Sequence, residues 1–446
     1  MSAQAASDPS TTTVAATVRT RSRSMVPEGP EHGYQDCDLT PPDRTDYDPP
    51  MRVVVVGAGV MGAWTARWLQ RAGHAVTLVD RYGPGNTMGS SGDESRITRS
   101  SHGPDRHYPI WQRRALGQWR ELEREAGQQL FVNTGVVWLA SEGQAFEAQS
   151  LVSLRALGIP VEQWSKDQLA ARVPVMDPAG VPWALFEPEA GALLARPAVT
   201  ATVAAFQAEG GEVMVGRVAP THASRGALDS VQLDDGRTLS ADAFVFACGP
   251  WLADLFPALL GEMIVPHRQD VLQFGVPSGD GRYAPGAMPV WIDFERSFYG
   301  FPSFDGVGLK SCPDWLGPRE RPDDSSREVA DATIEASRAI LRRRFPAVAE
   351  QPVVKTWTCF YEVTPDAHFV IDRHPDLTNA WIAGGGSGHA FKHGPVIGEY
   401  LAALVGGDPA AAAALAPPDD RFAIHARAPQ PSFRTSGRKP ADVELA

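Results

Sequence analysis

Short apolar runs that end in glycine recur along this chain. The first, RVVVVGAG at 52–59, is a β-branched run that enters a glycine-rich turn, so it predicts a strand. Residues 60–73 carry apolar positions at helical spacing and end in a glycine, so they predict a helix. Residues 74–81 predict a second strand, and the strand-then-glycine pattern returns at 242–251 and 379–391. This pattern indicates an α/β nucleotide-binding domain interrupted by a second domain.

Length and charge narrow the class of protein. The chain has 446 residues, of which 43% are hydrophobic, and its formal net charge is -12. This charge argues against a nucleic-acid groove, because phosphate binding needs clustered Lys and Arg. No apolar run approaches the ~20 residues that span a bilayer. The polar stretch 1–50 has no apolar core typical of a secretory signal. We therefore expect a soluble cytoplasmic protein with no nucleic-acid or membrane partner.

The role of one of the four cysteines, Cys359, stays open. None of them forms a CxxC pair, so no metal site is indicated, and disulfides are not expected without a secretory signal. Cys359 lies among aromatic residues in KTWTCFYEVTPD. Packing and reactivity both remain open for it, and a cysteine in such a setting is more often a buried packing residue.

Three glycines form a dinucleotide fingerprint between the first predicted strand and helix. Gly57, Gly59 and Gly62 give the pattern G-x-G-x-x-G, which allows a tight turn, close approach of a pyrophosphate and close helix packing. Asp80 follows 23 residues after the first glycine, near the position of a ribose-binding carboxylate. Such a carboxylate repels a 2′-phosphate, so FAD or NAD fits better than NADP.

The Gly/Ser-rich stretch 86–103 carries two arginines three residues apart. With this spacing, Arg96 and Arg99 would share one helical face. Two cations near a cofactor indicate an anionic ligand, and a solvated basic turn is the alternative.

Four further segments carry a resemblance to a known family. Together with VVVVGAGVMG, they are GSSGDESRITR, FYGFPSFDGVGLK, TCFYEVTPDAHFVID and GGGSGHAFKHGPVIGE. From about residue 52 to residue 427, the chain resembles the monomeric sarcosine oxidase and N-methyltryptophan oxidase group of FAD-dependent amine oxidases. The resemblance implies a Rossmann-type FAD-binding domain with an inserted antiparallel-sheet substrate domain, and a monomer.

The resemblance also implies a division of the chain into domains. At both ends the composition decides instead: residues 1–50 are rich in Ser, Thr, Ala and Pro, which predicts a disordered extension, and the Pro-rich, polar stretch 427–446 predicts a flexible tail. The segments between them divide into an FAD-binding domain at 51–100, 195–250 and 355–426, and a substrate-binding domain at 101–194 and 251–354.

Roles for individual residues follow from the resemblance alone. It implies that FAD is bound covalently through the sulfur of Cys359. Arg99 and Lys392 would bind the substrate carboxylate, and Tyr299 and Tyr361 would line the substrate pocket. The remaining implied roles concern the flavin: Lys310 and Arg96 for reaction with oxygen, and the turn at Gly388, with Lys392, for holding the flavin ring.

Several positions depart from the family. Ser91 and Gly92 replace a histidine pair, Asp314 replaces a histidine, and Glu362 replaces a small hydroxyl residue. These changes make sarcosine itself a doubtful substrate and a cyclic or modified amino acid plausible. An added acid could pair with a second amine on the substrate, or both acids could be surface residues.

The activity that the resemblance implies is oxidation of a secondary amine, in an amino or imino acid, to an imine. Oxygen would reoxidise the flavin and give hydrogen peroxide. The alternatives are an amine dehydrogenase that passes electrons to another carrier, a non-catalytic flavin-binding partner protein, and a nicotinamide dehydrogenase.

Overall fold

The computed structural model describes residues 50–143, 145–219 and 226–428. The predicted N-terminal extension and C-terminal tail therefore lie almost wholly outside the described residues. All described residues belong to the unit Arg44–Ala446. Within the described part, no helix is both long and apolar enough to cross a membrane.

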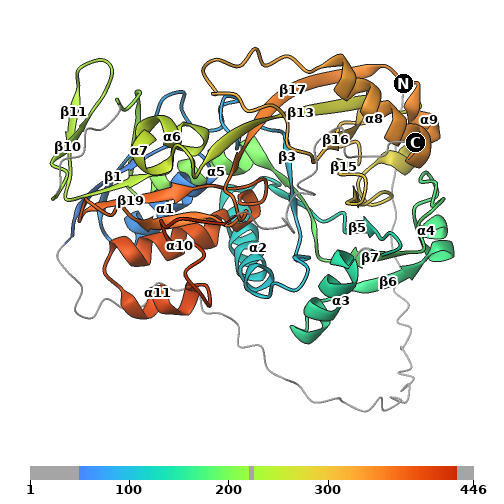
Figure 1. The fold of residues 1–446 in the computed structure, drawn as a ribbon, viewed down its shortest axis with the longest axis horizontal. Coiled ribbons are helices and arrows are strands. Elements are labelled where there is room, and N and C mark those ends of the chain that lie inside the picture. Colours follow the sequence, from blue (N-terminus) through green and yellow to red (C-terminus); the bar gives the residue numbers. More distant parts are fainter. Residues whose placement is uncertain (1–49, 144, 220–225, 429–446) are drawn as a thin grey trace, which may run out of the picture. The chain divides into compact units, whose positions relative to one another are not determined.

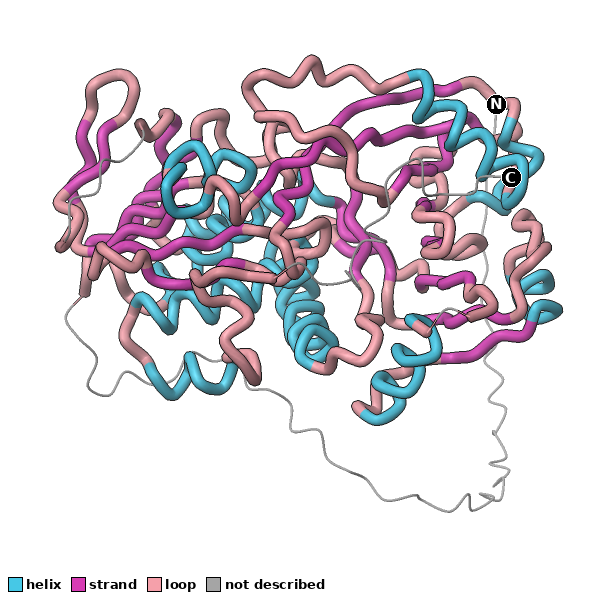
Figure 2. The backbone as a smooth tube through the Cα atoms, viewed as in Figure 1, coloured by secondary structure: helices cyan, strands magenta, loops and turns pink. Residues whose placement is uncertain are grey.

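A six-stranded sheet is built around the first predicted strand (Figures 1 and 2). Its neighbouring strands are parallel except for an antiparallel pair at one edge. In spatial order the strands are β18 (Val370–Arg373), β19 (Ala380–Gly384), β12 (Ala243–Phe246), β1 (Arg52–Val56), β2 (Ala75–Asp80) and β9 (Glu212–Val215). The strands predicted at 52–59, 74–81, 242–251 and 379–391 are confirmed.

Both faces of this sheet are covered, which explains why β1 is continuously apolar. Val53 and Val55 pack in a core with helices, whereas Val54 and Val56 face a second core. The helices on the first side are α1 (Val60–Arg71), α2 (His107–Ala126), α5 (Ala195–Ala208), α10 (Gly394–Val405) and α11 (Pro409–Leu415). The short helices on the other side are α6 (Leu252–Leu255) and α7 (Pro257–Leu260). Figure 1 shows α10 and α11 on one side of β19, and α6 and α7 on the other.

The second large sheet has eight strands and is largely antiparallel. Its single parallel pair among the described strands joins β14 to β5. In spatial order the strands are β17 (Val353–Val363), β13 (Val265–Gly275), β16 (Gly308–Pro313), β15 (Phe298–Phe301), β14 (Val290–Asp293), β5 (Val136–Leu139), β7 (Trp183–Glu187) and β6 (Glu162–Ser165). Helices α8 (Asp331–Arg344) and α9 (Pro346–Ala349) pack on this sheet, and α3 (Phe146–Ala156) and α4 (Lys166–Arg172) lie near β7 and β6.

The two longest of the described strands reach from the eight-stranded sheet toward the six-stranded sheet. β13 and β17 are each 11 residues long and pair along their length. Figure 2 shows them side by side, extending toward the six-stranded sheet. The predicted domain boundary at residue 355 falls inside β17, so the division into domains stays a prediction.

Two small sheets complete the described strands. β8 (Gly191–Leu194) lies between β3 (Ser95–Thr98) and β4 (Phe131–Val132), and β10 (Ser230–Gln232) forms a hairpin with β11 (Thr238–Ser240). A parallel Rossmann-like sheet joined to a largely antiparallel sheet confirms the predicted fold class.

Candidate active site

A cavity extends from the glycine turn after β1 to the residues that precede α10. Its lining includes nine of the positions singled out from the sequence: Gly57, Gly59, Asp80, Arg96, Arg99, Tyr299, Tyr361, Gly388 and Lys392. Gly62, Lys310 and Cys359 are not among the lining residues. The tertiary structure thus brings together residues from both large sheets around one cavity.

The glycine turn has the geometry that the fingerprint requires. Gly57 has φ +106°, and a Cβ there would lie 2.3 Å from the carbonyl oxygen of Ala247. A Cβ on Gly62 would lie 1.9 Å from the carbonyl oxygen of Gly57. At Gly59 the nearest atom to an added Cβ is the Oγ of Ser91, at 3.4 Å, so this position stays open toward the cavity.

This end of the cavity fits the pyrophosphate and ribose of a dinucleotide. Gly59 and the first residues of α1 line the cavity, and α1 has no acidic residue in its first turn. The positive end of the helix dipole therefore faces the site of an anion. The carboxylate of Asp80 accepts hydrogen bonds from the N–H groups of Ala58 and Tyr82, each at 2.8 Å. Burial raises the pKa of Asp80 despite these hydrogen bonds.

A buried ion-pair cluster lies behind the cavity wall. Nζ of Lys310, on β16, lies 2.7 Å from Oδ2 of Asp93, and their side chains are 2% and 0% exposed. Arg96 donates to the same carboxylate oxygen, and Nε1 of Trp357 donates to Oδ1 of Asp93 at 2.9 Å. Burial alone would raise the pKa of Asp93, but Lys310 and Arg96 outweigh burial and hold this pKa below its ordinary value. Asp93 thus fixes two cations of the site in place.

Cys359 lies on β17 beside this cluster. It is 2% exposed and packs with Val271 and Cys312, next to Tyr299 and Trp357. Burial raises the pKa of the Cys359 thiol, while the charges of Arg96 and Lys310 favour the thiolate. The structure therefore shows a packed cysteine with cations nearby, which is compatible with either role considered for it.

The two tyrosines form one wall of the cavity. The hydroxyl of Tyr361 donates to Oδ1 of Asp314 at 3.0 Å. Gly388 has φ +76°, and a Cβ there would come within 3.0 Å of the Tyr361 ring, so only glycine lets the ring take this place. Burial raises the pKa of Tyr299 and of Tyr361 well above the ordinary value, so both are neutral phenols.

Two basic side chains line the cavity near these tyrosines. Arg99 is 7% exposed, and its guanidinium carbon lies 4.8 Å from the centre of the Trp138 ring. Burial lowers the pKa of Arg99 to about 10, against the opposing charges of Glu187 and Asp314. Lys392 lies in the short 3₁₀ helix Phe391–His393, and its Nζ donates to the carbonyl oxygen of His389 at 2.9 Å. These two residues offer charge-assisted donors to an anion.

Three interpretations of the sequence are wrong in the folded chain. The helical face shared by Arg96 and Arg99 is wrong, because residues 95–98 form β3, which pairs with β8. Both arginines still line the cavity, so the alternative of a solvated turn is also wrong. The possibility that Asp314 and Glu362 are surface residues is wrong as well: both line the cavity, and Glu362 is 7% exposed.

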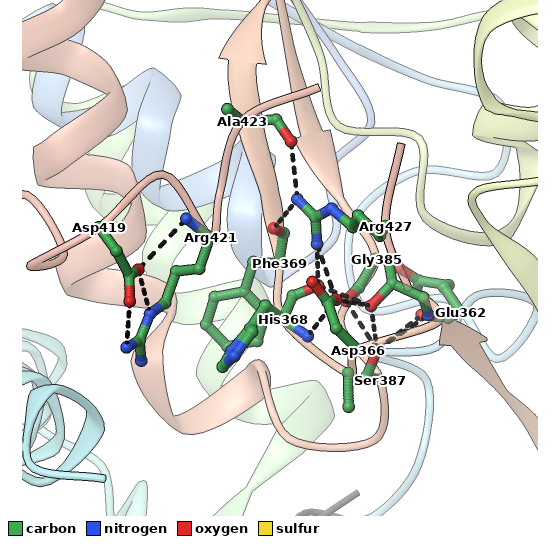
Figure 3. A network of polar contacts seen from close by, with 12 residues as sticks. Glu362, Asp366, His368, Phe369, Gly385, Ser387, Asp419, Arg421, Ala423 and Arg427 are labelled. Carbon is green, nitrogen blue, oxygen red and sulfur yellow. Dashed lines mark hydrogen bonds and ion pairs between the residues drawn. The ribbon is translucent and has the colours of Figure 1, made fainter. Parts of the chain in front are cut away.

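A polar network holds the turn that carries Gly388 (Figure 3). The N–H of Gly386 donates to Oε2 of Glu362 at 3.4 Å, and the N–H of Ser387 donates to the backbone oxygen of Glu362 at 3.0 Å. Burial raises the pKa of Glu362. Arg427 donates to the carboxylate of Asp366 at 3.0 Å and to the backbone oxygens of His368 and Phe369. Arg427, the first residue of the predicted tail, is thus anchored to this loop.

Three buried histidines behind Lys392 could hold a metal ion by geometry. One nitrogen from each of His102, His389 and His393 lies within 4.8 Å of the others. The rings also stack with aromatic neighbours, including Phe369 on His389 at 4.3 Å. Two of the ring nitrogens already bond to backbone oxygens, Nδ1 of His102 to Ser100 at 2.8 Å and Nε2 of His389 to Ala367 at 3.0 Å, so we assign this cluster to packing.

Sequence reasoning missed the residues that act through tertiary contacts. Asp93 lies three residues before Arg96, directly after a Gly/Ser-rich stretch. No local pattern indicates its contact with Lys310, which is 217 residues away. Trp357 and Glu187 were missed for the same reason. Glu187 is a buried carboxylate that accepts hydrogen bonds from the N–H groups of Ser100 and Ser101, at 2.6 and 3.2 Å.

The fold and the cavity define a dinucleotide-binding protein built from two large sheets. A sequence profile of the family described as FAD dependent oxidoreductase matches residues 52–404, so the chain belongs to this family. Its cofactor is therefore FAD, and the glycine turn, the helix end and Asp80 fit that group.

Individual relatives agree with the family. The chain is 34% identical over 360 residues to a monomeric sarcosine oxidase of Bacillus sp. (strain NS-129), covering 79% of this chain and 92% of that one. It is 27% identical over 365 residues to an N-methyl-L-tryptophan oxidase of Yersinia pestis (strain Pestoides F), covering 80% and 94%. Among solved structures, a thermally stable mutant of fructosyl peptide oxidase matches with a TM-score of 0.74 at 22% identity, covering 88% and 98%. The resemblance drawn from the sequence is confirmed.

Proposed function

We propose that the protein oxidises a secondary amine in an amino or imino acid to an imine, with oxygen as electron acceptor and hydrogen peroxide as product. The names of the relatives support this proposal, since they are oxidases of N-methyl amino acids. When bound, FAD supplies the acceptor for two electrons and a proton equivalent from the substrate.

The observation that carries the proposal is the presence of two basic side chains in the lining of the FAD cavity. Arg99 and Lys392 come from segments almost 300 residues apart, yet both line the cavity that contains the glycine turn. In the proposed function they bind the carboxylate of the substrate. Charge-assisted hydrogen bonds from two sides give one fixed pose, and a fixed pose lowers the entropic cost of reaction.

The tyrosines shape the place of the amine. Tyr299 and Tyr361 are neutral phenols in the cavity wall, so they exclude water without adding charge. The described cavity holds no residue that we assign as a general base. In the proposed function the amine is therefore bound with its nitrogen deprotonated.

Lys310 and Arg96 are the candidates for promoting the reaction with oxygen. Reduction of oxygen creates negative charge, and preorganised cations stabilise such charge. Lys310 lies behind the wall formed by Phe301, with its Nζ 4.8 Å from the centre of that ring. Arg96 lines the cavity itself.

Cys359 is proposed as the covalent anchor of FAD through a thioether. Its position beside Tyr299 and Trp357 supports this role; burial raises the pKa of its thiol, and the charges of Arg96 and Lys310 act against burial by favouring the thiolate. Acid precipitation of the purified protein tests it: flavin absorbance should stay with the polypeptide in the wild type and move to the supernatant in Cys359→Ala. The control is Cys248→Ala, which should keep its flavin bound. Yellow colour released from the wild-type protein would contradict the anchor.

One observation favours a dehydrogenase as the second candidate. The charge of Lys310 is partly offset by Asp93, at 2.7 Å, and this weakens the stabilisation that it offers to reduced oxygen. Peroxide formed per amine oxidised separates the two functions. One peroxide per turnover supports the oxidase, whereas turnover with a dye acceptor and little peroxide supports the dehydrogenase.

The central test is anaerobic mixing of the holoenzyme with N-methyl and cyclic amino acids. We expect the oxidised flavin absorbance to bleach with at least one of these compounds. Arg99→Gln should raise the apparent dissociation constant for that compound by about tenfold or more, because a buried charged donor is lost. Exposed Arg113→Gln, 42% exposed, is the control. No bleaching with any amino or imino acid would refute the proposed function.

A further inference from the structure

Asp314 places a carboxylate in the wall of the candidate substrate site. It follows β16 directly and lines the cavity, where its side chain is only half-buried. Its backbone N–H donates to the carbonyl oxygen of Ser297 at 2.6 Å, and its Oδ1 accepts from Tyr361 at 3.0 Å. The carboxylate is therefore held in one position at the cavity surface.

The two basic residues assigned to substrate binding and the two carboxylates nearest to them balance in formal charge. Arg99 and Lys392 bring two positive charges, and Glu187 and Asp314 bring two negative charges. Glu187 lies beside Arg99, where it also accepts from Nε1 of Trp138 at 3.0 Å. The sum of these four formal charges is zero.

A simple amino acid would disturb this balance. With its reacting amine deprotonated, it adds one negative charge, the carboxylate, beside the buried side chains of Arg99 and Lys392. An unbalanced buried charge is costly. The cluster of Asp93, Lys310 and Arg96 carries one formal positive charge, and the carboxylate of Glu362, which also lines the cavity, offsets it. A second, protonated amine on the substrate would restore neutrality beside Asp314.

We propose that the substrate is a dibasic amino or imino acid, and that Asp314 binds the ammonium group of its second amine. This inference rests on the proposed function and adds the substrate class. Asp314, which accepts a hydrogen bond from Tyr361, then determines which substrate is preferred. Arg99 and Lys392 bind the carboxylate and do not determine that preference. The competing explanation is that Asp314 only offsets the charge of Arg99, and this explanation requires no second amine.

Two matched pairs of compounds distinguish these explanations. Piperazine-2-carboxylate differs from piperidine-2-carboxylate by one ring amine in place of a methylene. Nα-methylornithine differs from Nα-methylnorleucine by a terminal ammonium in place of a methyl. The measurement is kcat/KM for anaerobic flavin reduction of the holoenzyme at pH 8, with both enantiomers of each compound.

We expect the wild type to prefer the dibasic member of at least one pair by tenfold or more, because a hydrogen bond between charged groups is worth about that factor or more. Asp314→Asn should reduce this preference at least tenfold, and Asp314→Glu should retain part of it. Asp324→Asn, which removes a carboxylate that is 68% exposed, controls for net charge and should keep the preference.

The outcomes separate the inference from the function on which it rests. Equal oxidation of both members in both pairs by the wild type overturns the inference and leaves the proposed function standing. A preference that survives Asp314→Asn also overturns it. If none of the four compounds reduces the bound flavin, but simpler N-methyl amino acids do, the dibasic substrate class is wrong. If no amino acid reduces it, the proposed function fails too. If Asp314→Asn does not fold, the wild-type preference still decides the substrate class, and loss of part of that preference in Asp314→Glu tests the role of Asp314.

Discussion

Asp93 gives the sharpest test of how this site is held together. We consider Asp93→Asn, which keeps the size of the side chain and removes its charge. In the native protein the carboxylate lies 2.7 Å from Nζ of Lys310 and also accepts from Arg96 and Trp357, with no exposed side-chain surface. The variant would leave two buried cations facing a neutral amide.

The magnitude follows from the geometry. Two unit charges at 2.7 Å attract by about 6 kcal/mol at an effective dielectric constant of about 20. Desolvation offsets part of that attraction, and removal of one partner from a buried pair costs about 3–5 kcal/mol in proteins. We therefore expect Asp93→Asn to lower the free energy of unfolding by about 3–5 kcal/mol.

Urea unfolding of the holoprotein at pH 7, followed by tryptophan fluorescence, measures this loss. A useful control is Glu189→Gln, which breaks an ion pair with Arg113 whose side chains are about 40% exposed and should cost under about 1 kcal/mol. Adding Lys310→Met to Asp93→Asn should restore at least about 1 kcal/mol, because one of the uncompensated charges is removed. If Asp93→Asn costs no more than Glu189→Gln, the cluster is not an ion pair shielded from water.

The same pair has a defined pH dependence. The pKa of Asp93 in the folded protein lies below its ordinary value of 3.8. Its contribution is therefore complete above pH 3.8 and is lost as the pH falls through the lower, folded-state pKa. The difference in stability between wild type and Asp93→Asn should shrink only below about pH 3.8.

Three further perturbations test separate parts of the structure. Lys310→Met should slow flavin reoxidation by oxygen about 10²–10³-fold and slow flavin reduction less than threefold in stopped-flow experiments. The control is Lys355→Met, at a side chain that is 48% exposed. Equal effects on both half-reactions would remove the role proposed for Lys310. Burial raises the pKa of Glu147 from 4.5 to about 7, so the free energy of unfolding should fall by about 3 kcal/mol between pH 4.5 and 7, and Glu147→Gln should flatten this slope in thermal melts across that range. Gly62→Ala puts a Cβ 1.9 Å from the first glycine's carbonyl oxygen and should abolish FAD retention, whereas Gly117→Ala meets no atom within 4 Å and should keep full flavin content; equal flavin content in both would contradict the role given to the turn.

The dinucleotide-binding turn and the strands around it can be predicted from the amino-acid sequence. These features are local: the apolar run of β1, the spacing of three glycines and the acid at the end of β2 lie within 30 residues. Gly57 and Gly62 are required by close contacts with neighbouring backbone, and Gly59 leaves room toward the cavity, so the spacing alone carries the information. The family resemblance added the residues that the cavity gathers, including Arg99, Lys392 and both tyrosines.

The arrangement of the site's charges depends on contacts between distant parts of the chain. The segment with Arg96 has helical spacing, yet it forms β3 because β8, almost 100 residues later, pairs with it. The contact of Asp93 with Lys310 spans 217 residues, and that of Tyr361 with Asp314 spans 47. Such contacts form when two sheets pack around a common cavity, and a pairing across that distance leaves no periodic pattern along the chain. The glycines therefore reveal where the cofactor binds, while the folded chain decides which carboxylates balance which cations.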